Sequence, residues 1–202
     1  EHVGEVVGHV FLEPFPAHKV AGNVYFVGGK GQASYLITTP QGNILINSGV
    51  IESPPMIKAS IEKLGFKYAD TKILLISHAH DRDTVRLGGT VLTAHKTAGH
   101  TKGCTTWTLK VNEGGKSLNV AIVGSPNVNP GFVLVGNKKY PGIAEDYEKT
   151  FRELKALPVD IFLGAHGDYY GMPAKYEKMQ AGAGTAAFVD PAGYKAYIAN
   201  RE

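Results

Sequence analysis

The sequence is poor in cysteine and has no long apolar run, and each absence narrows what the protein can be. A single cysteine, Cys104, excludes an internal disulfide and leaves the redox compartment undecided. No apolar stretch approaches the roughly 20 residues that a membrane-spanning helix needs. We therefore expect neither a membrane-spanning segment nor a membrane partner.

The excess of positive over negative charge is also small. The formal net charge is only +3 and no basic run is longer than Lys138-Lys139, whereas nucleic-acid-binding domains gather Lys and Arg in a patch. We expect no nucleic-acid partner. The sequence shows no signal peptide and begins with Glu1 rather than Met, so we expect either a processed export signal or a trimmed chain.

What is present is a series of short apolar segments separated by turn residues. They predict two strand-rich halves, each followed by helices, within one domain spanning residues 1–202. The run over 72–76 is apolar almost throughout, which is typical of a buried strand. Strands are predicted over 24–27, 34–38, 43–46, 72–76, 92–95, 105–111, 118–123 and 160–163, and helices over 53–64 (with Ser53 as N-cap), 143–154, 174–179 and 191–200.

Four histidines follow predicted strands or lie in turns beside them. His78 and His80 come directly after the run over 72–76, His100 lies in a glycine-containing turn, and His166 follows the strand over 160–163. Zinc accepts neutral imidazole, and a catalytic zinc site keeps three protein ligands and one open position. The alternative for His78 and His80 is a surface or helix-capping role. Structural or surface roles are predicted for the other histidines, which are His2, His9, His18 and His95.

Several segments resemble the metallo-β-lactamase superfamily, and subclass B3 in particular. Residues 73–80 resemble the strand and opening histidines of its H-x-H-x-D-H motif. Residues 88–95 and 97–107 resemble the third-ligand region of subclass B3, and 124–131 and 140–147 resemble further B3 segments. The resemblance covers nearly the whole chain. It implies an α/β fold, an αββα sandwich of two packed mixed β-sheets with helices on the outer faces.

The resemblance also implies a site and a reaction. His78, His80 and His100 match a three-histidine zinc site, and His166 matches the histidine of a second site. The implied reaction is hydrolysis of the β-lactam amide bond by zinc-bound hydroxide, with a small-molecule β-lactam as substrate. The implied location is the periplasm or the exterior of the cell.

A further segment resembles the region near the carboxylate of the substrate. Its polar residues are Ser125, Asn127 and Asn129. Asn, Pro and Gly also shape loops, so these residues are predicted either to bind substrate or to hold the loop.

The family pattern breaks after His80. Arg82 and Asp83 occupy the positions of the motif's Asp and His, and Arg cannot ligate zinc. The next family segment follows too early, which indicates that a segment between His80 and Asp81 is deleted or left out of the chain, unless Asp81 fills the aspartate role one position early. Asp81 then orients the zinc-bound water, adds a ligand or is a solvated turn residue.

The break has two consequences. One zinc ion is expected from the surviving ligands, in place of the two of the intact pattern. A deletion would expose a sheet edge, which a homo-oligomer or a domain swap would cover.

Two other functions stay open. One is another hydrolase of the same superfamily, acting on a thioester, a lactone or a phosphodiester, because one fold hosts many chemistries. The other is an inactive scaffold that binds zinc, which the shortened motif supports.

Overall fold

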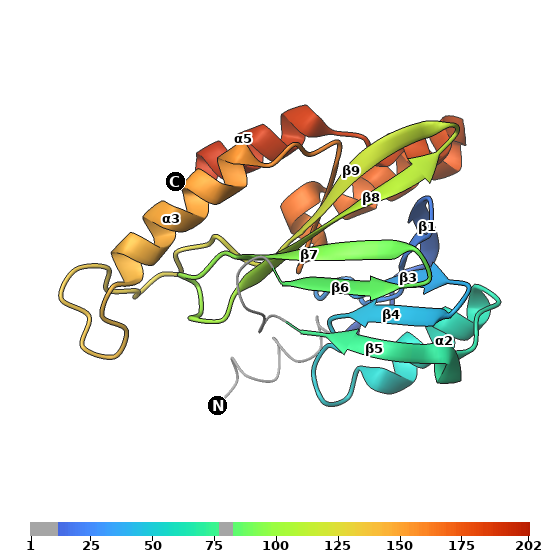
Figure 1. Cartoon of the computed structure of the whole chain (residues 1–202), viewed down its shortest axis with the longest axis horizontal. Coiled ribbons are helices and arrows are strands. Elements are labelled where there is room, and N and C mark those ends of the chain that lie inside the picture. Colours follow the sequence, from blue (N-terminus) through green and yellow to red (C-terminus); the bar gives the residue numbers. More distant parts are fainter. Residues whose placement is uncertain (1–11, 77–82) are drawn as a thin grey trace.

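Two five-stranded sheets pack against each other in the computed structural model, which describes residues 12–76 and 83–202 (Figure 1). The first sheet contains, in spatial order, β1 (His18–Ala21), β2 (Val24–Phe26), β3 (Tyr35–Thr39), β4 (Gly42–Ile46) and β5 (Thr71–Leu75). The order in the second sheet is β10 (Ile161–Gly164), β9 (Lys116–Val123), β8 (Thr105–Glu113), β7 (Thr90–Lys96) and β6 (Thr84–Leu87). Only the β4–β5 and β9–β10 pairs are parallel, so both sheets are mixed.

Helices cover the outer faces of the two sheets. On the first sheet, α2 (Pro54–Lys63) packs Ile57 and Ile61 against Leu36 and Leu45. On the second, α3 (Ile143–Ala156) and α5 (Pro191–Arg201) lie side by side (Figure 1), and α5 contacts β10. The shorter α4 (Met172–Lys178) follows β10. The predicted αββα sandwich is confirmed. Within the described residues, no helix combines the length and the apolarity needed to cross a bilayer.

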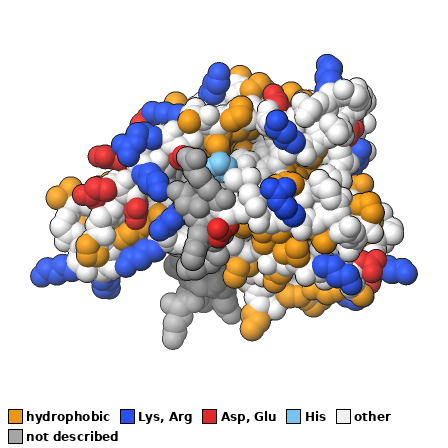
Figure 2. Space-filling view, viewed as in Figure 1, with side chains coloured by type: hydrophobic (Ala, Val, Ile, Leu, Met, Phe, Trp, Pro, Cys, Tyr) orange, Lys and Arg blue, Asp and Glu red, His pale blue; other side chains and the backbone are white. Residues whose placement is uncertain are grey.

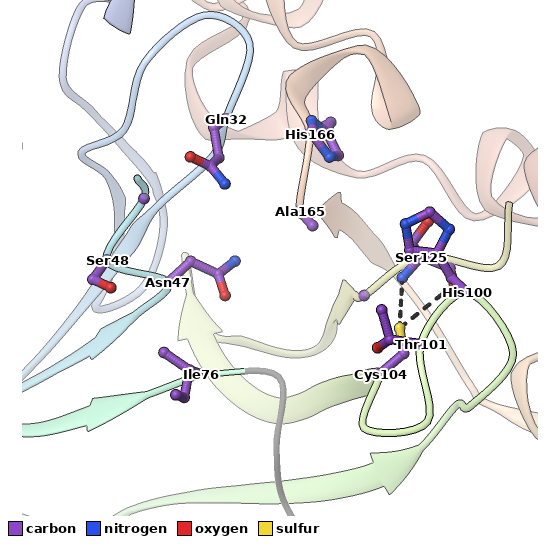
Figure 3. Close-up of a pocket in the computed structure, with 12 residues that line it drawn as sticks. Gln32, Asn47, Ser48, Ile76, His100, Thr101, Cys104, Ser125, Ala165 and His166 are labelled. Carbon is purple, nitrogen blue, oxygen red and sulfur yellow. Dashed lines mark hydrogen bonds between the residues drawn. The ribbon is translucent and has the colours of Figure 1, made fainter. Parts of the chain in front are cut away.

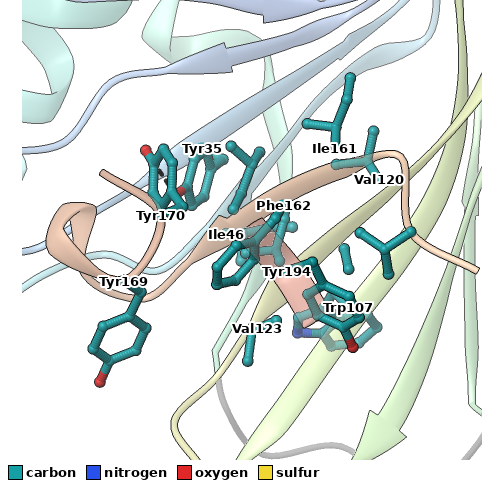
Figure 4. Packing of buried hydrophobic residues seen from close by; sticks show 14 of the residues in the cluster. Tyr35, Ile46, Trp107, Val120, Val123, Ile161, Phe162, Tyr169, Tyr170 and Tyr194 are labelled. Carbon is teal, nitrogen blue, oxygen red and sulfur yellow. Dashed lines mark hydrogen bonds between the residues drawn. The ribbon is translucent and has the colours of Figure 1, made fainter. Parts of the chain in front are cut away.

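The main core fills the space between the sheets and extends under α3 and α5. Aromatic rings supply much of it, as Figure 4 shows around Phe162 of β10. Tyr35 on β3 also links the two sheets, because its hydroxyl donates to the backbone oxygen of Gly164 at the end of β10 (2.7 Å). Burial raises the pKa of Tyr35 above its ordinary value, so this hydroxyl remains a donor at neutral pH.

Most predicted elements are confirmed, with ends shifted by one or two residues. The helix predicted over 53–64 is α2, which begins at Pro54 directly after Ser53. Ser53 does not cap it through its side chain; its hydroxyl accepts instead from the N–H of Val50 (3.0 Å). Two four-residue strands, β1 and β6, were not predicted.

The prediction that residues 72–76 form a buried strand is wrong. The strand β5 exists, but among residues 12–76 and 83–202 it is the last strand of its sheet and pairs with β4 alone. Leu74 is 53% exposed, and Ile76, just past the strand, is 55% exposed. Figure 2, drawn in the same view as Figure 1, shows hydrophobic side chains gathered at the lower right, where β5 lies. The physical reason is position: a run of apolar residues does not show which strands pair with it, and the pairing decides whether the strand lies inside the sheet or at its edge.

Candidate active site

A cavity of about 270 Å³ opens where several strands end. The parallel pairs β4–β5 and β9–β10 bring their carboxyl ends to one edge of each sheet, which is where open α/β layers place ligands. Figure 3 shows the labelled side chains around this space. The lining residues are Gln32, Asn47, Ser48, Gly49, Ile76, His100, Thr101, Cys104, Gly124, Ser125, Ala165 and His166.

His100 reaches the cavity from the loop between β7 and β8. Its Nδ1 lies 3.1 Å from the backbone oxygen of Asn127. A carbonyl oxygen can only accept, so Nδ1 carries a proton, which leaves Nε2 as the ring nitrogen that can present a lone pair. The ring of Phe132 stacks on His100 with centroids 5.9 Å apart. The imidazole is therefore fixed both in tautomer and in orientation.

His166 enters from the opposite side, directly after β10. Its Nδ1 lies 2.6 Å from the backbone oxygen of Gly31, which fixes the same tautomer as in His100. The ring of Tyr169 packs beside it with centroids 5.1 Å apart. The two histidines, 66 positions apart in the chain, thus come from different loops and line one cavity.

This arrangement fits a zinc site in part. Metal-binding histidines almost always donate their second ring N–H to a carbonyl or carboxylate, as His100 and His166 do here. Among residues 12–76 and 83–202, however, no group of three or more His, Cys, Asp or Glu side chains is arranged to hold a metal, and no carboxylate lines the cavity. Two imidazoles alone do not complete a zinc coordination shell.

The remaining predicted site residues precede His100 in the sequence. His78, His80 and Asp81 fall outside the described residues. Ile76, two positions before His78 in the sequence, lines the cavity.

Cys104 lines the cavity without offering a thiolate. Burial raises the pKa of its thiol, so the group stays protonated at neutral pH. Its Sγ accepts from the N–H of Ser125 (3.0 Å), as drawn in Figure 3. These contacts make Cys104 part of the cavity wall.

The three predicted substrate-binding candidates lie in different surroundings. Ser125 lines the cavity, and its hydroxyl lies 3.0 Å from that of Tyr169. The Asn127 side chain donates to the Tyr169 hydroxyl (3.0 Å), and Asn127 is not among the lining residues. Asn129 is exposed, and its backbone oxygen accepts from the N–H of Phe132 (3.0 Å).

Sequence reasoning missed the polar wall contributed by the first sheet. Gln32 lies in the loop between β2 and β3, and its Oε1 is buried with no hydrogen-bond partner among the described residues. Asn47 and Ser48 follow β4, and Asn47 has a positive φ of 63°. Asn tolerates this conformation better than most residues, and such conformations gather at functional sites. The Asn-Ser-Gly sequence after a strand was the one available signal.

The remaining histidines in the described residues have structural surroundings. His18 is buried and stacks between Phe26 and Phe188. His95 bonds through Nδ1 to Glu153 (2.8 Å) and through Nε2 to Thr108 (2.9 Å), which ties β7 to α3. The predicted structural roles of these two are confirmed. His2 and His9 lie outside the described residues.

Gly99, next to His100, provides a test of how tightly this loop is packed. Its φ is +138°, and a Cβ added there would lie 2.7 Å from a ring carbon of Tyr147. Gly99→Ala is therefore expected to lower the free energy of unfolding by about 2–3 kcal/mol, because backbone strain and a clash add together. Urea unfolding measures the change. Gly182→Ala is the matched control, since φ there is +104° and a Cβ would meet nothing within 4 Å; equal losses in the two variants would refute the packing argument.

Comparison with known structures agrees with the architecture: the fold is the metallo-β-lactamase fold. No sequence-family model matches the chain. The native FEZ-1 metallo-β-lactamase from Legionella gormanii is 43% identical over 94% of this chain and 93% of its own, with a TM-score of 0.91. BJP-1, a subclass B3 metallo-β-lactamase of Bradyrhizobium japonicum, is 31% identical over 96% of this chain and 94% of its own, with a TM-score of 0.89. The chain belongs to the family of subclass B3 metallo-β-lactamases.

Proposed function

We propose that the protein hydrolyses the amide bond of β-lactams in a zinc-dependent reaction. The observation that carries this proposal is the pair of histidines at one cavity, His100 and His166, each held in the Nδ1–H tautomer by a backbone carbonyl. Two relatives described as metallo-β-lactamases are more than 30% identical to the chain over nearly its whole length. That kinship supports β-lactam hydrolysis over the other chemistries that the fold hosts.

His100 would hold zinc through Nε2 as one ligand of the three-histidine site, and His166 would supply the histidine of the second site. We assign His78 and His80 as further ligands and Asp81 as the carboxylate that orients the attacking water or adds a ligand, on the family motif alone. Bound zinc polarises a carbonyl and lowers the pKa of a coordinated water to about 7. One zinc ion per chain is the proposed content.

The chain's own polar residues would orient the substrate. Gln32 Oε1 is a buried acceptor without a described partner, and an N–H of the substrate would satisfy it. Ser125 supplies a second polar group, on the opposite sheet. We further propose a periplasmic or secreted location, where an enzyme of this kind meets the antibiotic and confers resistance.

The test is hydrolysis of a chromogenic cephalosporin by the purified protein, with added zinc and again after chelation. We expect turnover with zinc, loss of at least about 100-fold with chelator, and recovery when zinc is restored, because open zinc sites supply the nucleophile. A thioester, a lactone and a phosphodiester are assayed in parallel. Turnover of one of these without β-lactam hydrolysis would reassign the substrate, and zinc uptake well below one per chain with no hydrolysis would identify an inactive scaffold.

A further inference from the structure

Asn127 lies at the centre of a hydrogen-bond network beside the cavity. Its backbone oxygen accepts from His100 Nδ1 (3.1 Å) and from the hydroxyl of Tyr147 (2.7 Å). Its side-chain Nδ2 donates to the hydroxyl of Tyr169 (3.0 Å), and its Oδ1 accepts from the hydroxyl of Tyr197 (3.4 Å). Main chain and side chain of one residue are thus both anchored, and the carbonyl that fixes His100 belongs to it.

The tyrosines around Asn127 are buried and neutral. Burial raises the pKa of Tyr147 to about 12. Burial likewise raises the pKa of Tyr169 and of Tyr197. All three hydroxyls therefore keep their protons at neutral pH, so Tyr147 and Tyr197 can act as the donors that the geometry requires.

The same network reaches His166 through Tyr169. The Tyr169 ring packs against the His166 ring (5.1 Å between centroids). The backbone N–H of Tyr169 also donates to the backbone oxygen of His166 (3.3 Å). Its ring also stacks on Tyr197 at 5.3 Å. The path from one histidine to the other is therefore continuous: His100, Asn127, Tyr169, His166.

We propose that Asn127 is a positioning residue that, with Tyr169, holds His100 and His166 in fixed relation to each other. The Asn127 carbonyl accepts two hydrogen bonds, and the Asn127 side chain is anchored at both of its polar atoms. This carbonyl therefore holds His100 in one orientation. Outer-shell partners of metal-binding histidines set metal affinity, and losing one costs about 10–100-fold. This inference rests on the proposed function and gives Asn127 a different role from contact with substrate.

Zinc affinity in a double-mutant cycle tests the proposal. Asn127→Ala removes both side-chain bonds, and Tyr169→Phe removes the hydroxyl while keeping the ring against His166. Each is expected to weaken zinc binding about 10-fold, as for other outer-shell partners, and the double variant is expected to be no weaker than the worse single variant. Competition with a chromophoric chelator measures this.

Tyr194→Phe is the matched control. It also loses one buried tyrosine hydroxyl, which donates to the backbone oxygen of Leu154 (2.7 Å) away from the cavity. Its zinc affinity is expected to equal that of the unaltered protein. Full zinc affinity in Tyr169→Phe, or independent effects that multiply in the double variant, would overturn the proposal. Unchanged affinity with a raised KM in Asn127→Ala would assign Asn127 to substrate instead.

A second measurement on the metal-free protein separates this proposal from the function on which it rests. Long-range ¹H–¹⁵N spectra of the histidines report their tautomers, and we expect the Nδ1–H form for His100 and His166. Tyr169→Phe should shift the His100 signals although Tyr169 does not contact that ring, and Tyr194→Phe should not. Absence of zinc uptake by the unaltered protein would defeat the proposed function, whereas His100 signals unmoved by Tyr169→Phe would defeat the positioning role.

Discussion

His100→Ala is expected to lower zinc-dependent β-lactam turnover by more than about 100-fold, because loss of an outer-shell partner alone costs about 10–100-fold and this change removes a proposed ligand. Alanine removes the imidazole nitrogen that would bind zinc from the β7–β8 loop, and the stacking of Phe132 is lost with it. Zinc content, measured on the same preparations, should fall together with turnover.

His95→Ala is the matched control for that experiment. The same side chain is removed five residues away, but His95 bonds to Glu153 and Thr108 and does not line the cavity. Its loss should lower stability, since two hydrogen bonds between β7, β8 and α3 disappear, while zinc content stays unchanged. Turnover in folded His100→Ala equal to that of His95→Ala would show that the site has been assigned to the wrong histidines.

The sequence predicted the fold better than the details of the site. The β3–β4 hairpin was predictable because two apolar segments flank the turn residues Pro40-Gln41-Gly42. Such a pattern of neighbouring residues can be read directly from a sequence. The strands β1 and β6 were missed because four residues are too short for a period of two to stand out. Exposure of β5 was missed because position in a sheet depends on partners far along the chain.

Part of the site was likewise predictable from the sequence, and part was not. His100 and His166 were predicted as ligands from strand-end positions and family resemblance, and the structure places both at one cavity. Their partners were not predictable, because Gly31 is 135 residues from His166 and offers only a backbone oxygen. The amino-acid type of Asn127 indicated a polar role, but a carbonyl shared by His100 and Tyr147 has no side-chain signature.

The exposed edge at β5 matters for the predicted assembly. Leu74 and Ile76, which precede the break in the family pattern after His80, are both more than half exposed. Native edge strands are usually protected by charge, bulges or a covering element, and Lys72 is the only charged side chain in β5. Formation of a homo-oligomer or a domain swap through this edge stays a prediction.

Phe162→Ala is expected to destabilise the protein by about 3–5 kcal/mol, the usual cost of deleting a buried aromatic ring. Phe162 is 1% exposed, and its ring contacts Tyr194 and Tyr197 of α5 at 5.4 and 5.0 Å between centroids. The cavity left between β10 and α5 would have to be closed by moving a helix that packs against the sheet. Because the strand leads directly to His166, the loss also loosens the base of the proposed site.

Urea unfolding of the metal-free protein measures this loss, since bound metal adds its own stabilisation to the folded state. The expected result is a lower midpoint with an unchanged slope, which reports lost stability without a change in the surface exposed on unfolding. Ile51→Ala is the control, because Ile51 is 90% exposed and surface truncations usually stay within about 0.5 kcal/mol. A loss below about 1 kcal/mol in Phe162→Ala would mean that α5 is not held on β10 by this ring, and that the second sheet is stabilised chiefly by its hairpins.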